Sequence, residues 1–255
     1  MGKIVGRWGW WLLLGLPILA FLTLPVIAIA LRSIGSSAHL TPDFVQAIRL
    51  SFETSFLSIV LIVLLGTPLA FALARFRFPL HRLAAVLVDL PVVLPPAAAG
   101  IGLLLAFGRQ GYVPTSFAFT TTAVVMAQTF VACPFYLRAA INAFKATDRD
   151  LEESASLDGA SSIAVFANIT LPICGAALAS GAITSWARAL GEFGATILFA
   201  GNLIGKTQTM PLAIYLGFES DLDQAVLLSG ILLATAFVAI VAVRALADRD
   251  RQAIT

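Results

Sequence analysis

Six long stretches of this sequence contain no Asp, Glu, Lys or Arg, and they constrain the fold more than any other feature. They cover residues 8–31, 54–74, 90–108, 110–137, 159–187 and 224–243. An α-helix needs about 20 apolar residues to cross the roughly 30 Å hydrocarbon core of a bilayer. The stretches are apolar on all sides and do not alternate in period two, which favours helices over the strands of a membrane barrel.

These stretches predict an all-α, polytopic membrane protein that forms a single domain over residues 1–255. We expect six membrane helices, at about 9–31, 53–74, 85–108, 117–140, 173–199 and 225–246, with Asp89 near the inner end of the third. Only 12% of the residues are charged and 59% are hydrophobic, whereas soluble domains carry about 25% charged residues. The net charge of +2 is too small to favour a nucleic-acid partner.

Lys and Arg residues gather on one side of this predicted topology. With the N-terminus in the cytoplasm, eleven of the sixteen lie on the cytoplasmic side. They are Lys3, Arg7, Arg75, Arg77, Arg82, Arg138, Lys145, Arg149, Arg244, Arg249 and Arg251. The positive-inside rule therefore predicts a multi-pass protein of the plasma membrane (the inner membrane in a Gram-negative cell) with both termini in the cytoplasm.

The predicted loop between the fourth and fifth spans is unusual because it is long, acidic and rich in small residues. Asp148 or Asp150 is suited to cap a short helix, whose first turn then holds further carboxylates. An apolar stripe is expected on that helix, formed by Ala155, Leu157, Ala160, Ile163 and Phe166. With Gly159 in its middle, such a helix would form a docking element on the cytoplasmic face, and a plain solvated connector is the alternative.

This loop resembles the coupling motif of the permease subunits of ABC importers. That motif is Glu-Ala-Ala, three residues, Gly, nine residues, Ile, one residue and Leu-Pro. The matching residues here are Glu153, Ser154, Ala155, Gly159, Ile169, Leu171 and Pro172, and only Ser154 departs from the motif. The resemblance implies the type I importer permease fold, with a coupling loop at 148–172 that docks into a separate ATPase subunit and Pro172 at the start of the fifth span.

Two further stretches resemble the molybdate and sulfate branch of these permeases. They are Leu90–Gly111 and Ser185–Tyr215, and the run Gly191–Thr196 followed by Thr207–Thr209 is more similar to the molybdate permeases. The resemblance implies an importer of molybdate or tungstate, with a sulfate or thiosulfate permease as the alternative. It also implies three protein partners: a dimer of ABC ATPase subunits, an extracytoplasmic molybdate-binding protein and a second copy of this chain.

Five residues are candidates for the translocation path. Arg188 and Glu192 lie four residues apart within the fifth expected span, and ionisable groups at membrane depth face a cavity or each other. They either attract the oxyanion or only neutralise each other. Gly194 allows another helix or a pore to pass close by. Pro95 and Pro96 interrupt the third expected span, where a plain kink is the alternative to a cavity lining.

No catalytic, cofactor or metal site is expected, and the chain is not expected to be an enzyme. The segment Ala200–Thr207 fits a relaxed phosphate-loop pattern, but no strand is expected before it, so we interpret it as an outer turn. The carboxylates of Asp148, Asp150, Glu152 and Glu153 form a solvated helix start more plausibly than a metal site. The remote alternative is a secondary transporter driven by an ion gradient through Arg188 and Glu192. The coupling motif argues against it, because such a carrier does not need that motif.

Overall fold

The computed structural model describes residues 5–36, 38–39 and 41–254, and the regular secondary structure in these ranges is entirely helical. The elements in chain order are α1 (Val5–Ile34), α2 (Pro42–Arg75), α3 (His81–Val93), α4 (Pro96–Phe107), α5 (Thr121–Ala146), α6 (Arg149–Leu157), α7 (Ser162–Val165), the π-helix η1 (Phe166–Thr170), α8 (Leu171–Leu190), α9 (Gly194–Phe199), α10 (Met210–Ser220) and α11 (Leu222–Ile254). The predicted all-α class is confirmed.

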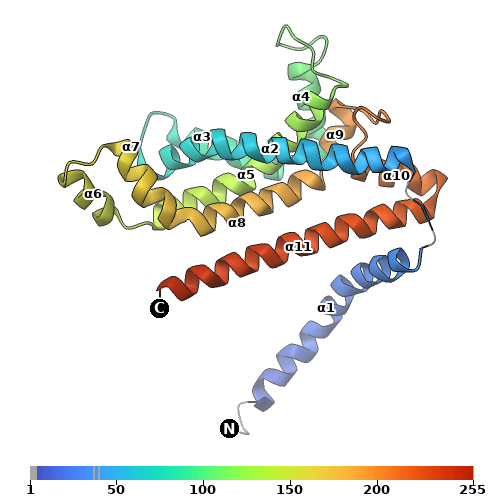
Figure 1. Cartoon of the computed structure of the whole chain (residues 1–255), viewed down its shortest axis with the longest axis horizontal. Coiled ribbons are helices and arrows are strands. Elements are labelled where there is room, and N and C mark those ends of the chain that lie inside the picture. The colour runs from blue at the N-terminus through green and yellow to red at the C-terminus, as the bar shows by residue number, and fades with distance from the viewer. Residues whose placement is uncertain (1–4, 37, 40, 255) are drawn as a thin grey trace.

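The centre of the molecule is a bundle in which α5 packs against both α2 and α8 (Figure 1). Small residues let these helices approach closely, as is usual between membrane helices. A Cβ added to Gly181 in α8 would lie 2.6 Å from the Cβ of Ala139 in α5. One added to Gly66 in α2 would lie 3.2 Å from Leu137 of α5. The bundle core is therefore set by close backbone packing as well as by large side chains such as Phe144.

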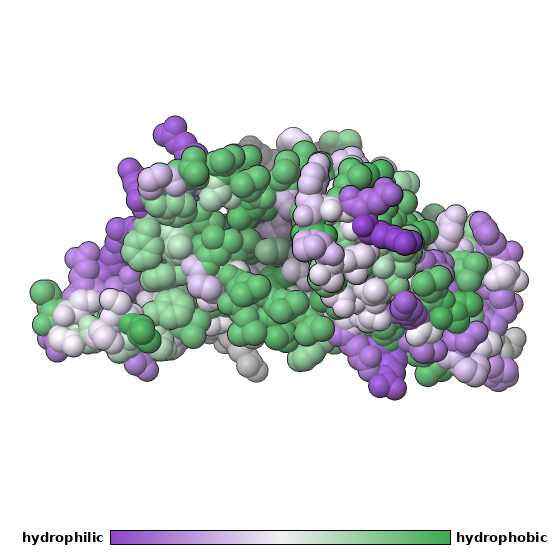
Figure 2. Space-filling model, turned by 90° about the horizontal axis from the view of Figure 1, so that it is seen from above, coloured by the Kyte–Doolittle hydropathy of each residue, from purple (hydrophilic) through white to green (hydrophobic). Residues whose placement is uncertain are grey.

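Two outer helices lie beside this bundle: α11 packs against it, and α1 packs against α11. α11 runs beside α8, and α1 contacts α11 where Gly230 faces Ser33 (Figure 1). The opposite end of α1 diverges from the rest of the molecule and exposes large apolar side chains such as Leu14 and Phe21. Figure 2 shows hydrophobic residues over a broad part of one face, with hydrophilic residues toward both ends and in a further patch right of the centre. This distribution fits a bundle whose long axis crosses a bilayer.

Five helical stretches in the described residues are long and apolar enough to span a membrane, and a sixth is counted if α3 and α4 form one broken span. The third expected span, over 85–108, is not one continuous helix, because the chain bends by 119° between α3 and α4, at the prolines where a break or a plain kink was expected. Leu94 and Pro95 each precede a proline and have extended ψ angles of 133° and 134°. A residue before proline is driven out of the helical region, which explains the break.

The fifth expected span is also shorter at its C-terminal end than predicted. α8 ends at Leu190, and a turn over 191–193 separates it from the short helix α9. α10 was not expected as a helix of its own. At the other end, α7, η1 and α8 form one helical stretch over Ser162–Leu190. The π-helix η1 ends at Thr170, two residues before Pro172, which has no N–H to continue the regular hydrogen-bond ladder.

Candidate functional site

The loop that carries the coupling motif forms two helices, not the single helix that the sequence suggested. Asp148 caps α6, and its side chain accepts a hydrogen bond from the amide of Asp150 at 3.1 Å. α6 ends at Leu157, and Gly159 follows with a φ of +93°. The amides of Gly159 and Ala160 then donate to the carbonyls of Ser156 and Ala155, at 3.1 and 3.0 Å. This pair of bonds is the Schellman C-cap, in which glycine is favoured because its φ is positive.

The prediction that Gly159 lies in the middle of a helix is therefore wrong, because it follows the end of α6. A Cβ at this position would meet no atom of the chain within 4 Å, so the backbone is open to solvent or to a partner. Its positive φ is a sufficient local reason for glycine, and an open surface is a second one. Any substitution that tests docking at Gly159 has to separate these two effects.

The expected apolar stripe is divided between two surfaces. Phe166 packs into the bundle, with its ring centroid 4.9 Å from that of Phe71 in α2 and 6.1 Å from that of Phe144 in α5. Leu157 and Ile163 flank the turn and are 89% and 81% exposed. Large apolar side chains exposed together in this way are typical of protein-interaction surfaces.

The remaining residues of the coupling motif are distributed over α6, η1 and α8. Glu153 and Ser154 are exposed on α6, while Ala155 is partly buried. Ile169 is partly buried in η1, and Leu171 and Pro172 are exposed in the first turn of α8. α6 packs against η1, so the two parts of the motif lie side by side although a turn and α7 separate them in the sequence.

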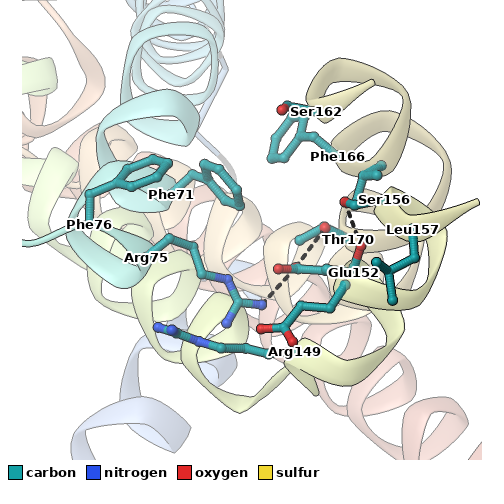
Figure 3. Close-up of a pocket in the computed structure, with 12 residues that line it drawn as sticks. Phe71, Arg75, Phe76, Arg149, Glu152, Ser156, Leu157, Ser162, Phe166 and Thr170 are labelled. Atoms are coloured by element: carbon teal, nitrogen blue, oxygen red, sulfur yellow. Dashed lines mark hydrogen bonds and ion pairs between the residues drawn. The ribbon is translucent and has the colours of Figure 1, made fainter. Parts of the chain in front are cut away.

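A cavity of about 580 Å³ lies between the end of α2 and this loop, and it contains a buried ion pair that the sequence analysis missed. Nη2 of Arg75 is 2.7 Å from Oε1 of Glu152, and the two side chains are only 6% and 16% exposed. The hydroxyl of Thr170 donates to the same Oε1 at 2.8 Å. Figure 3 shows Arg75 and Thr170 converging on Glu152 beside Phe71 and Phe166.

Arg75 also reaches the end of α5, because Nη2 donates to the carbonyl of Thr147 at 3.3 Å. The hydroxyl of Thr147 in turn contacts Sγ of Cys174 in α8 at 3.1 Å. No spacing rule in the sequence pairs residues that are 77 positions apart, as Arg75 and Glu152 are. The charge of Arg75 at the end of an apolar span was the only available signal.

The second candidate site lies at the junction of α8 and α9, where Arg188 and Glu192 form an ion pair of 2.9 Å. Glu192 was predicted to lie on the same helix as Arg188. It lies instead in the turn that follows Leu190. Its carboxylate is 1% exposed, and its Oε1 accepts a hydrogen bond from the amide of Ala195 at 2.9 Å. Glu192 thus caps α9, while the side chain of Arg188 remains 31% exposed.

The predicted glycine and proline residues meet at this junction. A Cβ on Gly194 would lie 2.7 Å from the Cβ of Pro96, so the start of α9 presses against the start of α4. Arg188 and Pro96 both line a small cavity of about 90 Å³, which Pro91 and Phe135 also line. Pro95 is exposed and is not among the lining residues. Four of the five candidates therefore come together, and Pro95 contributes the break in the chain.

The phosphate-loop pattern at Ala200–Thr207 is a turn between α9 and α10, without a preceding strand. Gly201 and Gly205 have φ values of +74° and +77°. The carbonyl of Gly205 accepts a hydrogen bond from Gln46 near the start of α2. Arg75 lies 29 positions after Gln46 in α2, and at about 1.5 Å per residue this places the turn roughly 44 Å from the coupling loop.

Comparisons with known proteins agree with this architecture. A family described as "Binding-protein-dependent transport system inner membrane component" matches residues 66–251. The molybdenum transport system permease protein ModB of Mycobacterium tuberculosis is 41% identical over 237 residues, which are 89% of this chain and 90% of that protein. The sulfate transport system permease protein CysW of Synechococcus elongatus is 36% identical over 202 residues, which are 74% of this chain and 71% of that one.

A solved structure of a bacterial ABC transporter that imports the acidic polysaccharide alginate contains a chain with a similar fold. The TM-score is 0.71 at 18% identity, and the match covers 98% of both chains.

Proposed function

Because this chain belongs to the family of inner membrane components of binding-protein-dependent transport systems, we propose that it is the membrane-spanning subunit of an ATP-driven importer of molybdate. Its role is to form the path for the ion, while a separate ABC ATPase supplies the energy. A second copy of the chain completes the pore, and an extracytoplasmic binding protein delivers the oxyanion.

The coupling loop carries this proposal. It combines the motif from Glu153 to Pro172 with a turn that exposes Leu157 and Ile163 at one end of the bundle. The same end holds Arg75, the last residue of α2, and Arg77, which follows α2. The positive-inside rule puts this end in the cytoplasm, where ATP is available, and it puts both termini there as well.

Alternating access follows from this arrangement. ATP binding draws two ATPase subunits together, and the two α6–α7 turns seated on them move with them. The bundles then rotate against each other and open the path outward to receive the ion. The helical stretch from α7 through η1 to α8 makes α8 a direct continuation of the loop.

Molybdate is preferred over sulfate because similarity to the ModB protein is higher and extends over more of this chain than similarity to the CysW protein. Molybdate and sulfate are both tetrahedral dianions, so one bundle geometry suits both. Arg188 is the candidate for attracting the anion, since it lines a cavity and keeps 31% of its side chain exposed. Glu192 is the structural member of the pair.

Reconstitution tests the proposal. The chain, its ATPase and its binding protein are assembled in proteoliposomes with ATP inside, and uptake of molybdate and of sulfate is measured. We expect molybdate uptake that requires ATP and binding protein and that persists when a protonophore removes the proton gradient. Uptake without ATP that collapses with the ion gradient would instead establish a secondary transporter, and preference for sulfate would establish the sulfate branch.

A further inference from the structure

α6 is held to the bundle mainly by polar contacts. None of its residues is buried, and its main helix contacts are with α7 and η1. It is joined covalently to α5 through Thr147–Asp148 and to α8 through α7 and η1. It has no such connection to α2, although α2 lies beside α5 along the bundle. Movement of α6 therefore reaches α2 only through side-chain contacts.

The ion pair between Arg75 and Glu152 is a directional side-chain contact between α2 and α6. Its partners lie at the end of α2 and on α6, 77 residues apart, and Thr170 at the end of η1 donates to the same carboxylate oxygen. Arg75 also binds the carbonyl that ends α5. One guanidinium and one carboxylate, both largely shielded from solvent, thus join α2, α5, α6 and η1 (Figure 3).

Such a pair is costly to build for stability alone. Removing two charges from water opposes folding, and well-packed apolar residues of the same volume often stabilise a protein as much. The phenylalanine contact between Phe71 and Phe166 already supplies apolar packing between α2 and η1. What the ion pair adds is a fixed direction and length, because each of its hydrogen bonds tolerates little distortion.

We infer that Arg75, Glu152 and Thr170 are positioning residues that pass the movement of α6 to α2 and α8 together. This inference rests on the proposed function, since it requires an ATPase that moves α6. Without the link, α8 follows the loop while α2 lags, so ATP is hydrolysed without full opening of the path. The quantity that the link controls is therefore the amount of molybdate imported for each ATP hydrolysed.

The test measures that ratio in proteoliposomes of the complete complex. Arg75→Gln and Glu152→Gln are compared with Arg77→Gln, which removes an exposed arginine two residues away that makes no ion pair in the described part of the chain. We expect the ratio to fall about fivefold or more in the first two, in the range of typical coupling energies. The Arg77→Gln complex should keep the wild-type ratio, and the ATPase should copurify with all three.

If either glutamine variant fails to fold, two milder substitutions of Thr170 test the same inference. Thr170→Val removes only the hydroxyl that binds Glu152, whereas Thr170→Ser retains it. The inference predicts a reduced ratio for Thr170→Val and a wild-type ratio for Thr170→Ser. Equal ratios for these two variants would overturn it. If the wild-type complex imports no molybdate with ATP, the proposed function fails, which is a separate result.

Discussion

Glu152 and Glu192 are both buried carboxylates that bind one arginine and one further donor, but they connect very different lengths of chain. Glu192 binds Arg188 four residues away and the amide of Ala195 three residues away, so all its partners belong to the α8–α9 junction. Glu152 binds Arg75 across 77 residues and Thr170 across 18. The first arrangement fixes the shape of a single junction. The second joins α2, α6 and η1, the elements whose common movement we propose.

The two carboxylates also differ in how their charge is neutralised. Both members of the Arg75–Glu152 pair are nearly buried, whereas Arg188 is 31% exposed and Glu192 is 1% exposed. Loss of either partner at the coupling loop strands a buried charge. At the α8–α9 junction only loss of the arginine does so, because the guanidinium has access to a cavity. The junction should therefore respond asymmetrically to substitution.

The largest effect is predicted for Arg188→Ala. The Glu192 carboxylate would remain in a site that is 1% exposed without its cation, at a cost of about 3–5 kcal/mol. We expect a marked loss of assembled complex, measured as the yield of monodisperse protein after detergent extraction. Full assembly of Arg188→Ala would contradict the structural role of the pair, whereas reduced molybdate uptake by the complex that does assemble would support Arg188 as the group that attracts the anion.

Glu192→Ala should be less damaging than Arg188→Ala. It leaves the amide of Ala195 uncapped and removes the partner of a cation that can reach the cavity, at a cost of about 1–3 kcal/mol. The double variant should assemble better than Arg188→Ala alone, since no carboxylate is then stranded. A double-mutant cycle on the free energy of unfolding measures this coupling, and additive single effects would contradict the structural interpretation of the pair.

Substitutions of Gly159 in the coupling loop are expected to have a smaller effect. Gly159→Ala imposes a side chain on a φ of +93°, which costs about 1–2 kcal/mol. Gly159→Asn adds more bulk but tolerates positive φ better. If the turn geometry alone matters, copurification of the ATPase should fall more for Ala than for Asn. If the open backbone at Gly159 touches the ATPase, the bulkier Asn should be the worse variant.

The smallest effect is expected at the opposite end of the bundle. Lys206 is exposed in the turn between α9 and α10, far from the coupling loop. Lys206→Ala should leave ATP hydrolysis by the assembled complex unchanged. A phosphate-loop lysine contacts the phosphates directly, so a collapse of hydrolysis in a complex that assembles normally would reverse the proposed topology.

The helical class and the approximate position of the spans follow from the sequence, because lipid admits few ways to satisfy a backbone. The break at Leu94–Pro95 was visible as two prolines, but its angle of 119° depends on how α4 packs against α9. The end of α8 at Leu190 was missed since Glu192 caps the next helix, and a capping carboxylate at membrane depth has no distinctive pattern.

The two candidate sites also differ in how much of each could be predicted from the sequence. The pair of Arg188 and Glu192 was predictable because residues four apart are neighbours on a helix or in its terminal turn. The motif from Glu153 to Pro172 was recognisable by its spacing, yet Glu152, the preceding residue, has the buried contacts. Tertiary contacts such as that of Arg75 with Glu152 arise only when distant helices meet, and no local spacing encodes them.

Photo-crosslinking from the two ends of the bundle tests the central claim most directly. p-Benzoylphenylalanine is placed at Leu157 or Ile163, beside the α6–α7 turn, or at Lys206 in the distant turn, and the assembled complex is irradiated. The account predicts that Leu157 and Ile163 crosslink to the ATPase subunit and that Lys206 does not. Crosslinks to the ATPase from Lys206, with none from Leu157 and Ile163, would contradict it.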